Sequence, residues 1–229
     1  MTQITLTSDP QTVIEVRRSN RARRLSLRVS SLDGRVTLTL PTRVRLAEAQ
    51  AFADDKAGWI ASALERQKPL VRVAAGTHIP VEGVERQVVV GKGKAARLLP
   101  TSVSAPEGGT GMAVMALLKS LARVRLVDAV DRYAQEIGRD FGRITLRDTR
   151  SRWGSCSQDG NLMFSWRLIM APVDVLDYVA AHEVAHLDRM DHSPAFWGLV
   201  AEICPNYEGP RAWLRQEGGG LHRFRFKAD

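Results

Sequence analysis

The chain has 229 residues, of which 44% are hydrophobic and 25% are charged, as is ordinary for a globular protein with a real core. No apolar stretch approaches the roughly 20 residues that a membrane span needs, and the two cysteines, Cys156 and Cys204, are too far apart in unlike contexts to indicate a disulfide framework. The formal net charge of +8 favours an anionic partner such as nucleic acid, a nucleotide or an acidic protein segment, although solubility alone also explains it.

These features predict a cytoplasmic chain with two reduced thiols and no membrane partner. Residues 1–10 lack the basic-then-apolar pattern of a secretory signal. Cys156 is expected to pack as a small residue and not to act as a nucleophile, because free cysteines are usually buried.

Residues 12–40 predict an antiparallel β unit. Apolar and polar residues alternate over 13–16, 25–29 and 36–40, and Asp33-Gly34 is a hairpin signal. Five arginines fall within residues 17–24, between the first two strands: Arg17, Arg18, Arg21, Arg23 and Arg24. This arginine cluster is either a contact for phosphate or acidic ligands or a solvated loop, and the lack of interleaved aromatic residues leaves both interpretations open.

The middle of the chain predicts a helix, further strands and then a boundary. Helical spacing of apolar residues covers 46–66, with Trp59 expected in the core. Strands are expected between 78 and 104. The glycine-rich loop 106–111 is the predicted boundary between an N-terminal β-rich region with one helix, residues 1–111, and a C-terminal domain, residues 112–229.

The C-terminal domain opens with a predicted helix over 112–138, where apolar residues recur every three or four positions. A β-hairpin follows within 143–165, with a turn at 159–161. Pro172 suits the first turn of the next helix, predicted over about 173–190, and Ser193-Pro194 predicts the start of another.

The helix predicted over 173–190 contains His182, Glu183 and His186 in a His-Glu-x-x-His pattern. Residues four apart lie one helical turn above each other, so both imidazoles can bind one metal ion. The carboxylate of Glu183 can then take a proton from a water at the open position of the metal. A structural zinc site would need no glutamate and would usually use cysteine.

A catalytic zinc ion normally has three protein ligands, and the sequence offers His192, Glu202 and Glu208 as the third. His192 is favoured, because it follows His186 at the metzincin spacing. The metzincin glycine is replaced by Arg189, however, and no methionine follows His192. Glu202 on the following helix is the gluzincin alternative. Asp188 or Asp191 is expected either to accept a hydrogen bond from a ligand imidazole or to lie on plain surface.

The C-terminal domain resembles the YgjP-like metal-dependent hydrolases, which are grouped with SprT/WLM-type zinc metallopeptidases. Several motifs in the same order carry the resemblance, closely over about residues 143–215. The N-terminal strands also resemble the opening of the family, and the helix over 112–138 is loosely similar. The closely matched motifs are Thr149–Ser157, Trp166–Leu168 with Pro172, Asp177–Leu187, and His192–Pro194 with Phe196-Trp197. One departure is Ser165, where the family usually has asparagine.

The resemblance implies that His182, His186 and His192 bind the metal and that Glu183 is the general base. The predicted fold class is α+β, with an N-terminal antiparallel β-rich half and a C-terminal zincin-like helical half that carries a β-hairpin beside the metal helix. The expected cofactor is Zn²⁺ or another divalent transition metal. Arg152 and Trp153 on the hairpin are candidate substrate-binding residues, although core packing explains Trp153 equally well.

The leading prediction is a metallopeptidase that acts on peptides or proteins. One alternative is a metal-dependent hydrolase of phosphoanhydrides or nucleotides, which the arginine cluster and the net charge would suit. Another is a nucleic-acid-associated module with a vestigial metal site, against which the intact Glu183 argues. Neither the substrate nor the oligomeric state follows from the sequence.

Overall fold

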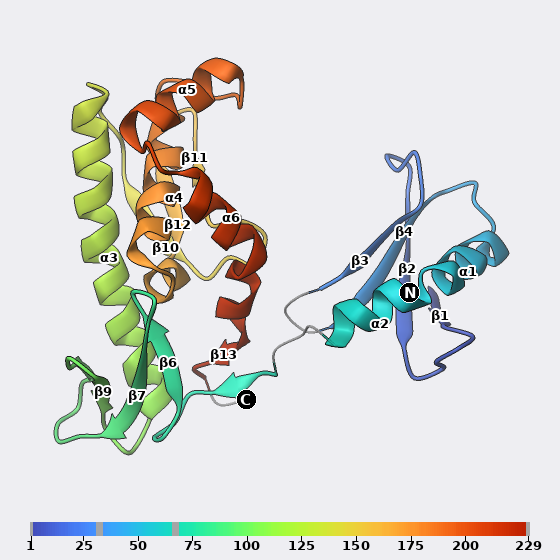
Figure 1. The fold of residues 1–229 in the computed structure, drawn as a ribbon, viewed down its shortest axis with the longest axis horizontal. Helices are drawn as coiled ribbons and strands as arrows, with labels where there is room; N and C mark the ends of the chain where they lie inside the picture. The colour runs from blue at the N-terminus through green and yellow to red at the C-terminus, as the bar shows by residue number, and fades with distance from the viewer. Residues whose placement is uncertain (1, 31–33, 66–68, 228–229) are drawn as a thin grey trace. The chain divides into compact units, whose positions relative to one another are not determined.

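A computed structural model describes residues 2–30, 34–65 and 69–227 and divides into two compact units, Met1–Pro69 and Leu70–Asp229. Helices and strands both contribute to it, which confirms the predicted α+β class (Figure 1). No helix among the described residues is long and apolar enough to cross a membrane.

The N-terminal unit is a four-stranded sheet with two helices. The sheet has the strand order β1-β2-β4-β3, and its inner side packs with the helices around a small core that includes Ile14, Leu38 and Ile60. The elements are β1 (Thr2–Thr5), β2 (Val13–Ser19), β3 (Ser26–Val29), β4 (Val36–Pro41), α1 (Leu46–Asp55) and α2 (Ala57–Glu65).

The N-terminal unit differs from the sequence expectation in three details. β3 and β4 pair antiparallel as predicted, but β2 pairs parallel with β4, because β4 lies between β2 and β3 in the sheet. The predicted single helix is broken at Lys56 into α1 and α2. Trp59 is 48% exposed, whereas the next residue, Ile60, fills the core position. The turn residue Asp33 and the helix end at Arg66 lie outside the described residues.

The C-terminal unit begins well before the boundary that the sequence predicted at residue 111. A four-stranded sheet, in the order β6-β7-β9-β8, packs against the long helix α3. The short strand β5 pairs with β13, which joins residues near the start of this unit to its end. The elements are β5 (Val71–Arg72), β6 (His78–Val81), β7 (Val84–Val90), β8 (Arg97–Leu98), β9 (Ser102–Ala105) and β13 (Phe224–Arg225). The strands of residues 70–105 therefore belong to the same unit as α3. The glycine-rich loop at 106–111 is not a boundary, because these strands contact α3 and β5 pairs with β13.

Helix α3 (Thr110–Glu136) runs along one side of the C-terminal unit (Figure 1). At 1.5 Å per residue it is about 40 Å long. Its apolar face, which includes the fully buried Val114, Leu118 and Leu126, packs against η1 (Trp166–Met170) and α4 (Val173–Ala185). The remaining elements are β10 (Ile144–Arg147), β11 (Gly154–Cys156), β12 (Leu162–Ser165), α5 (Pro194–Ile203), α6 (Glu208–Gln216) and η2 (Gly218–Arg223).

The predicted hairpin is present beside α4. β11 and β12 pair antiparallel around a turn in which Gly160 has φ of 70°. β10 pairs parallel with the other side of β12, which leaves β11 as an edge strand, and β11 contacts α4. α4 ends at Ala185, earlier than the predicted 190, and Ser193 begins α5 by accepting a hydrogen bond from the backbone N–H of Phe196.

Candidate active site

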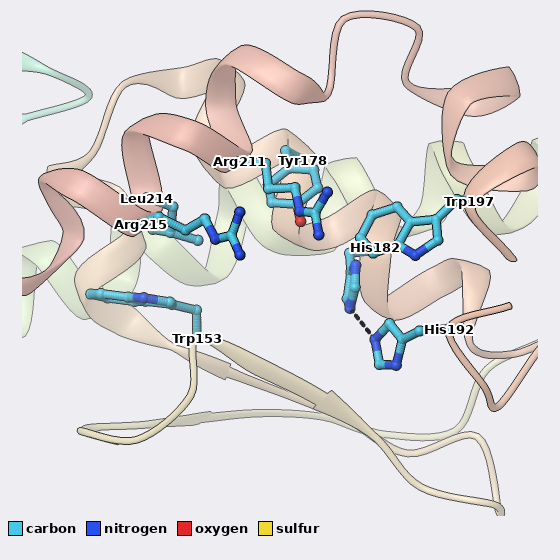
Figure 2. Close-up of a pocket in the computed structure, with 8 residues that line it drawn as sticks. All are labelled: Trp153, Tyr178, His182, His192, Trp197, Arg211, Leu214 and Arg215. Carbon is cyan, nitrogen blue, oxygen red and sulfur yellow. Dashed lines mark hydrogen bonds between the residues drawn. The ribbon is translucent and has the colours of Figure 1, made fainter. Parts of the chain in front are cut away.

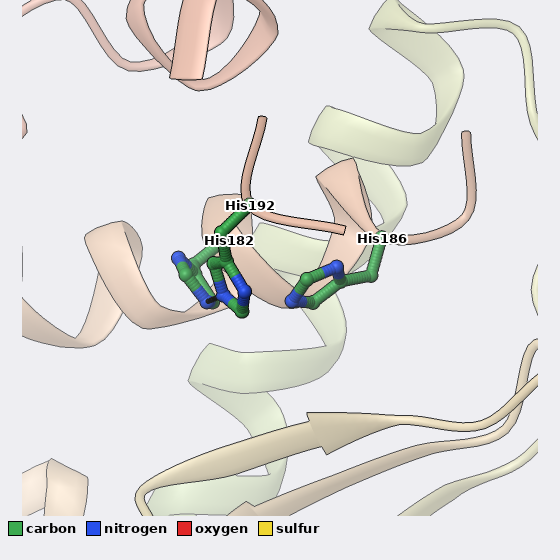
Figure 3. Close-up of side chains that lie close together, drawn as sticks. All are labelled: His182, His186 and His192. Carbon is green, nitrogen blue, oxygen red and sulfur yellow. Dashed lines mark hydrogen bonds between the residues drawn. The ribbon is translucent and has the colours of Figure 1, made fainter. Parts of the chain in front are cut away.

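The three predicted metal-binding histidines come together at the C-terminal end of α4 (Figure 3). His182 lies in the last turn of α4, and His186 caps the end of this helix. His192 lies in the connection just before Ser193, the residue that caps α5. The helix therefore stops where the second imidazole is placed, and the following loop returns the third imidazole to the other two.

The spacing of the three imidazoles fits one metal ion. One ring nitrogen from each lies within 4.8 Å of the others, and Nε2 of His182 is 3.2 Å from Nε2 of His192. Two nitrogen ligands of a tetrahedral ion are about 3.3 Å apart, because zinc–nitrogen distances are about 2.0–2.1 Å. Among the residues that the structure describes, Glu202 and Glu208 do not join this cluster.

The protonation of the imidazoles also suits a metal. Burial, followed by the nearby His186, His192 and Arg211, lowers the pKa of His182 to about 3. Burial also lowers the pKa of His186, against a hydrogen bond to the carbonyl of Arg189 that raises it. Both rings are therefore neutral at pH 7, and neutral imidazole is the form that binds metal.

A backbone carbonyl, and neither Asp188 nor Asp191, is the hydrogen-bond partner of a histidine in this cluster. Nδ1 of His186 is 2.9 Å from the carbonyl oxygen of Arg189, so a proton on Nδ1 leaves Nε2 free to bind a metal. Asp188 instead pairs with Arg139 and Arg189, and Asp191 accepts a hydrogen bond from the backbone of Ser193. Nδ1 of His182 is buried with no hydrogen-bond partner in the described chain.

Glu183 lies under the hairpin and is only 5% exposed. Burial raises the pKa of its carboxyl to about 8, against the charge of Arg152, which lowers it. The backbone of β11 approaches this side chain so closely that a Cβ on Gly154 would lie 2.5 Å from both Cγ and Oε1 of Glu183. Only glycine permits this approach. Beside it, burial and then the charge of Glu183 raise the pKa of the Cys156 thiol to about 11, which keeps that thiol protonated at pH 7.

A cavity of about 540 Å³ opens beside His182 and His192 (Figure 2). Aromatic and basic side chains and one leucine line its other walls, and they come from the hairpin, α4, α5 and α6. They are Trp153, Tyr178, Trp197, Arg211, Leu214 and Arg215. Apart from Trp153, none of these residues received a site role from the sequence alone. Tyr178 and Trp197 lie in the motifs that carry the family resemblance, and residues 211, 214 and 215 have i, i+3, i+4 spacing.

The two substrate-binding candidates occupy different places. Trp153 lines the cavity, and its ring also packs against His222, at 5.1 Å between centroids, so the side chain is partly packed and partly open to the cavity. Arg152 is exposed and lines a separate hollow, to which residues of β10, β11 and β12 contribute. The arginine cluster lies in the N-terminal unit, where Arg18 donates hydrogen bonds to the carbonyls of Thr42 and Val44.

The model of the YgjP-like metallopeptidase domain matches residues 23–217. The chain belongs to the YgjP-like family. This confirms the resemblance seen in the sequence, and it identifies a metallopeptidase-family domain, for which a divalent metal is the implied cofactor. The YgjP-like match includes β3, β4, α1 and α2 of the N-terminal unit and most of the C-terminal unit, whereas β1 and β2 lie before its start.

Other comparisons add little to the YgjP-like assignment. A solved structure of the metallopeptidase zymogen abylysin from Pyrococcus abyssi is 19% identical, with a TM-score of 0.35, and the match covers 40% of this chain and 95% of that one. No curated protein sequence matches the chain.

Proposed function

We propose that this YgjP-like chain hydrolyses peptide bonds with a divalent metal ion, zinc in the first place, held by His182, His186 and His192. The observation that carries the proposal is the convergence of three imidazoles at single-ion spacing next to a buried glutamate, in a metallopeptidase-family domain. When bound, the ion supplies Lewis acidity toward water and toward the scissile carbonyl.

Glu183 is proposed to be the general base. Its carboxylate takes a proton from the attacking water and delivers it to the departing amine. The backbone at Gly154 confines its position, and a divalent ion bound beside it would favour the ionised carboxylate that burial disfavours.

The edge of β11 is proposed to bind the substrate backbone. β11 pairs on one side with β12 and, within the described chain, with no other strand, so an extended peptide can add to it. Trp153, directly before β11, would contact a side chain of that peptide, and Arg152 would lie beside its course.

Removal of the metal tests the ligand set. Chelator-treated protein is expected to lose peptide hydrolysis and to regain it on addition of Zn²⁺. His192→Ala should weaken metal binding by more than the roughly 10–100-fold that loss of an outer hydrogen-bond partner costs, because it removes a ligand. Competition with a chromogenic chelator measures both effects.

Glu202→Gln is the matched control, since Glu202 is exposed on α5 and lies outside the histidine cluster. It should bind metal as the wild type does. Weak binding by Glu202→Gln together with normal binding by His192→Ala would show that the third ligand has been assigned wrongly.

Assays on denatured protein, on peptides and on nucleoside triphosphates decide between a peptidase and a phosphohydrolase.

Gly154→Ala tests the position of Glu183. The new methyl group would force the carboxylate to move, and a displacement of about 1 Å at a catalytic group can cost about 100-fold in rate. Overpacking should also lower the free energy of unfolding by about 1–3 kcal/mol. Gly198→Ala on α5, where a Cβ meets nothing within 4 Å, is the control and should keep full activity. Equal activity of the two variants would contradict the proposed position of Glu183.

A further inference from the structure

The cavity beside the histidines has an apolar floor and a positively charged wall. Trp153, Tyr178 and Trp197 provide three aromatic surfaces, and α6 contributes Arg211 and Arg215 (Figure 2). All eight residues that line this cavity are described, and none of them carries a carboxylate. The wall therefore has no negative charge of its own to neutralise the two guanidinium groups.

The aromatic side chains hold Arg211 in place. Its guanidinium carbon lies 4.2 Å from the centroid of the Trp197 ring, as in a cation–π contact. Trp197 stacks in turn on Tyr207, at 5.5 Å between centroids, and Tyr207 stacks on Tyr178 at 6.2 Å. This aromatic stack fixes the plane of the Arg211 guanidinium without using its N–H donors, which stay available to a ligand.

Arg211 and Arg215 lie one turn apart on α6, and both side chains extend toward the space between Trp153 and His182 (Figure 2). Like charges at this spacing disfavour a helix. Within the described residues, neither arginine pairs with a carboxylate, in contrast with Arg132, which pairs with Asp177, and Arg139, which pairs with Asp188. The two unpaired guanidinium groups face the cavity that adjoins the metal-binding histidines.

We propose that Arg211 and Arg215 bind a carboxylate of the substrate, so that the enzyme prefers peptides with a negative charge close to the scissile bond. The inference rests on the proposed peptidase function and adds a substrate class to it. A guanidinium group donates paired hydrogen bonds to a carboxylate, and Trp153 and Leu214 would contact the aliphatic part of the same residue. The carboxylate can come from an acidic side chain or from the C-terminus of a short peptide.

Three matched quenched-fluorescence peptides distinguish these sources with the zinc-loaded full chain. One carries a glutamate beside the scissile bond and an amidated C-terminus, the second carries glutamine and a free C-terminal carboxylate there, and the third carries glutamine and an amide. A charge-assisted pair should raise kcat/KM for at least one charged peptide about 10–100-fold over the neutral peptide. The charged peptide that gains identifies the source of the carboxylate.

The variants Arg211→Gln and Arg215→Gln should reduce this preference to about twofold or less, and Arg211→Lys should restore part of it, because lysine keeps the charge but not the paired donors. Arg97→Gln is the control, since Arg97 is an exposed arginine on β8 outside the cavity. Binding of the same peptides to zinc-loaded Glu183→Gln protein, measured by calorimetry, should show the same order of affinity without turnover.

The results separate the two proposals. If the wild type hydrolyses all three peptides equally well, or if the preference persists in both glutamine variants, the carboxylate subsite is wrong and the peptidase proposal stands. If the zinc-loaded wild type hydrolyses no peptide, the proposed function is wrong and this inference fails with it.

Discussion

Glu183→Gln should lower kcat/KM for peptide hydrolysis by about 10²–10⁴-fold, the contribution that a positioned general base or acid usually makes. Glutamine has the same shape as glutamate but cannot take a proton from water, so the loss should fall on kcat. The side chain is 5% exposed and lies against Gly154, so the variant fills the same space. Steady-state kinetics of the zinc-loaded proteins measures the effect.

The metal content of Glu183→Gln is the control for this experiment. Glu183 is not one of the three imidazole ligands, and the variant should therefore bind one zinc ion as tightly as the wild type does. Equal activity of the two zinc-loaded proteins on every peptide would falsify the general-base assignment. Low activity that is explained by low zinc content would instead assign Glu183 to the support of the metal.

Arg167→Met should lower the free energy of unfolding by about 3 kcal/mol, because it leaves two buried carbonyl acceptors without their donor and the half-exposed Asp148 without its partner. The side chain of Arg167 is 7% exposed and pairs with Asp148 at 2.7 Å. It also donates hydrogen bonds to the carbonyls of Leu221 and Phe224. Methionine would leave these carbonyls without that donor. For a unit of this size, thermal denaturation should show Tm lower by roughly 6–12 °C.

A second variant, Arg167→Lys, and the pH dependence of stability test whether the ion pair is the cause of the loss. Lysine keeps the charge but cannot reach the aspartate and both carbonyls with a planar fork, so it should rescue only part of the loss. Burial would raise the pKa of Asp148, but the hydrogen bonds and the charge of Arg167 outweigh it and lower this pKa. The pair therefore stabilises the fold above the ordinary pKa of aspartate and loses that effect as the pH falls through the lowered value. If Arg167→Met had the Tm of the wild type, the contacts of Arg167 with Asp148, Leu221 and Phe224 would not stabilise the fold.

The reactive part of the candidate site could be read from the sequence because it depends on one helix. The i, i+4 spacing places His182 and His186 on one face, and no tertiary contact is needed to bring them together. The cap at Ser193 is equally local, and it starts α5 where the sequence predicts. The third candidate ligand could not be chosen from the spacing along one helix. The sequence offered His192, Glu202 and Glu208, and the return of the loop after α4 leaves only His192 next to the other two imidazoles in the described chain.

Contacts between residues far apart in the sequence explain where the structure differs from the sequence-based expectations. β2 pairs parallel with β4, although both strands show the alternation that suits either direction. Trp59 and Ile60 are adjacent on a helix, and only the packing of α2 on its sheet decides that Ile60 is buried and Trp59 exposed. Residues 70–111 have strand patterns like those of the N-terminal sheet, yet their partner is α3, so they pack in the C-terminal unit.

By itself, the sequence determined the family, the α+β class and the His-Glu-x-x-His pattern, because spacing along a single helix or strand and a set of ordered motifs are local properties of a chain. The tertiary structure decided the third imidazole, the glycine against Glu183 and the arginine-bearing cavity wall. These features join residues from α4, α5, α6 and the hairpin. These residues lie close together because apolar faces that are far apart in the sequence are buried against one another. No pattern along a single helix or strand specifies which faces pair.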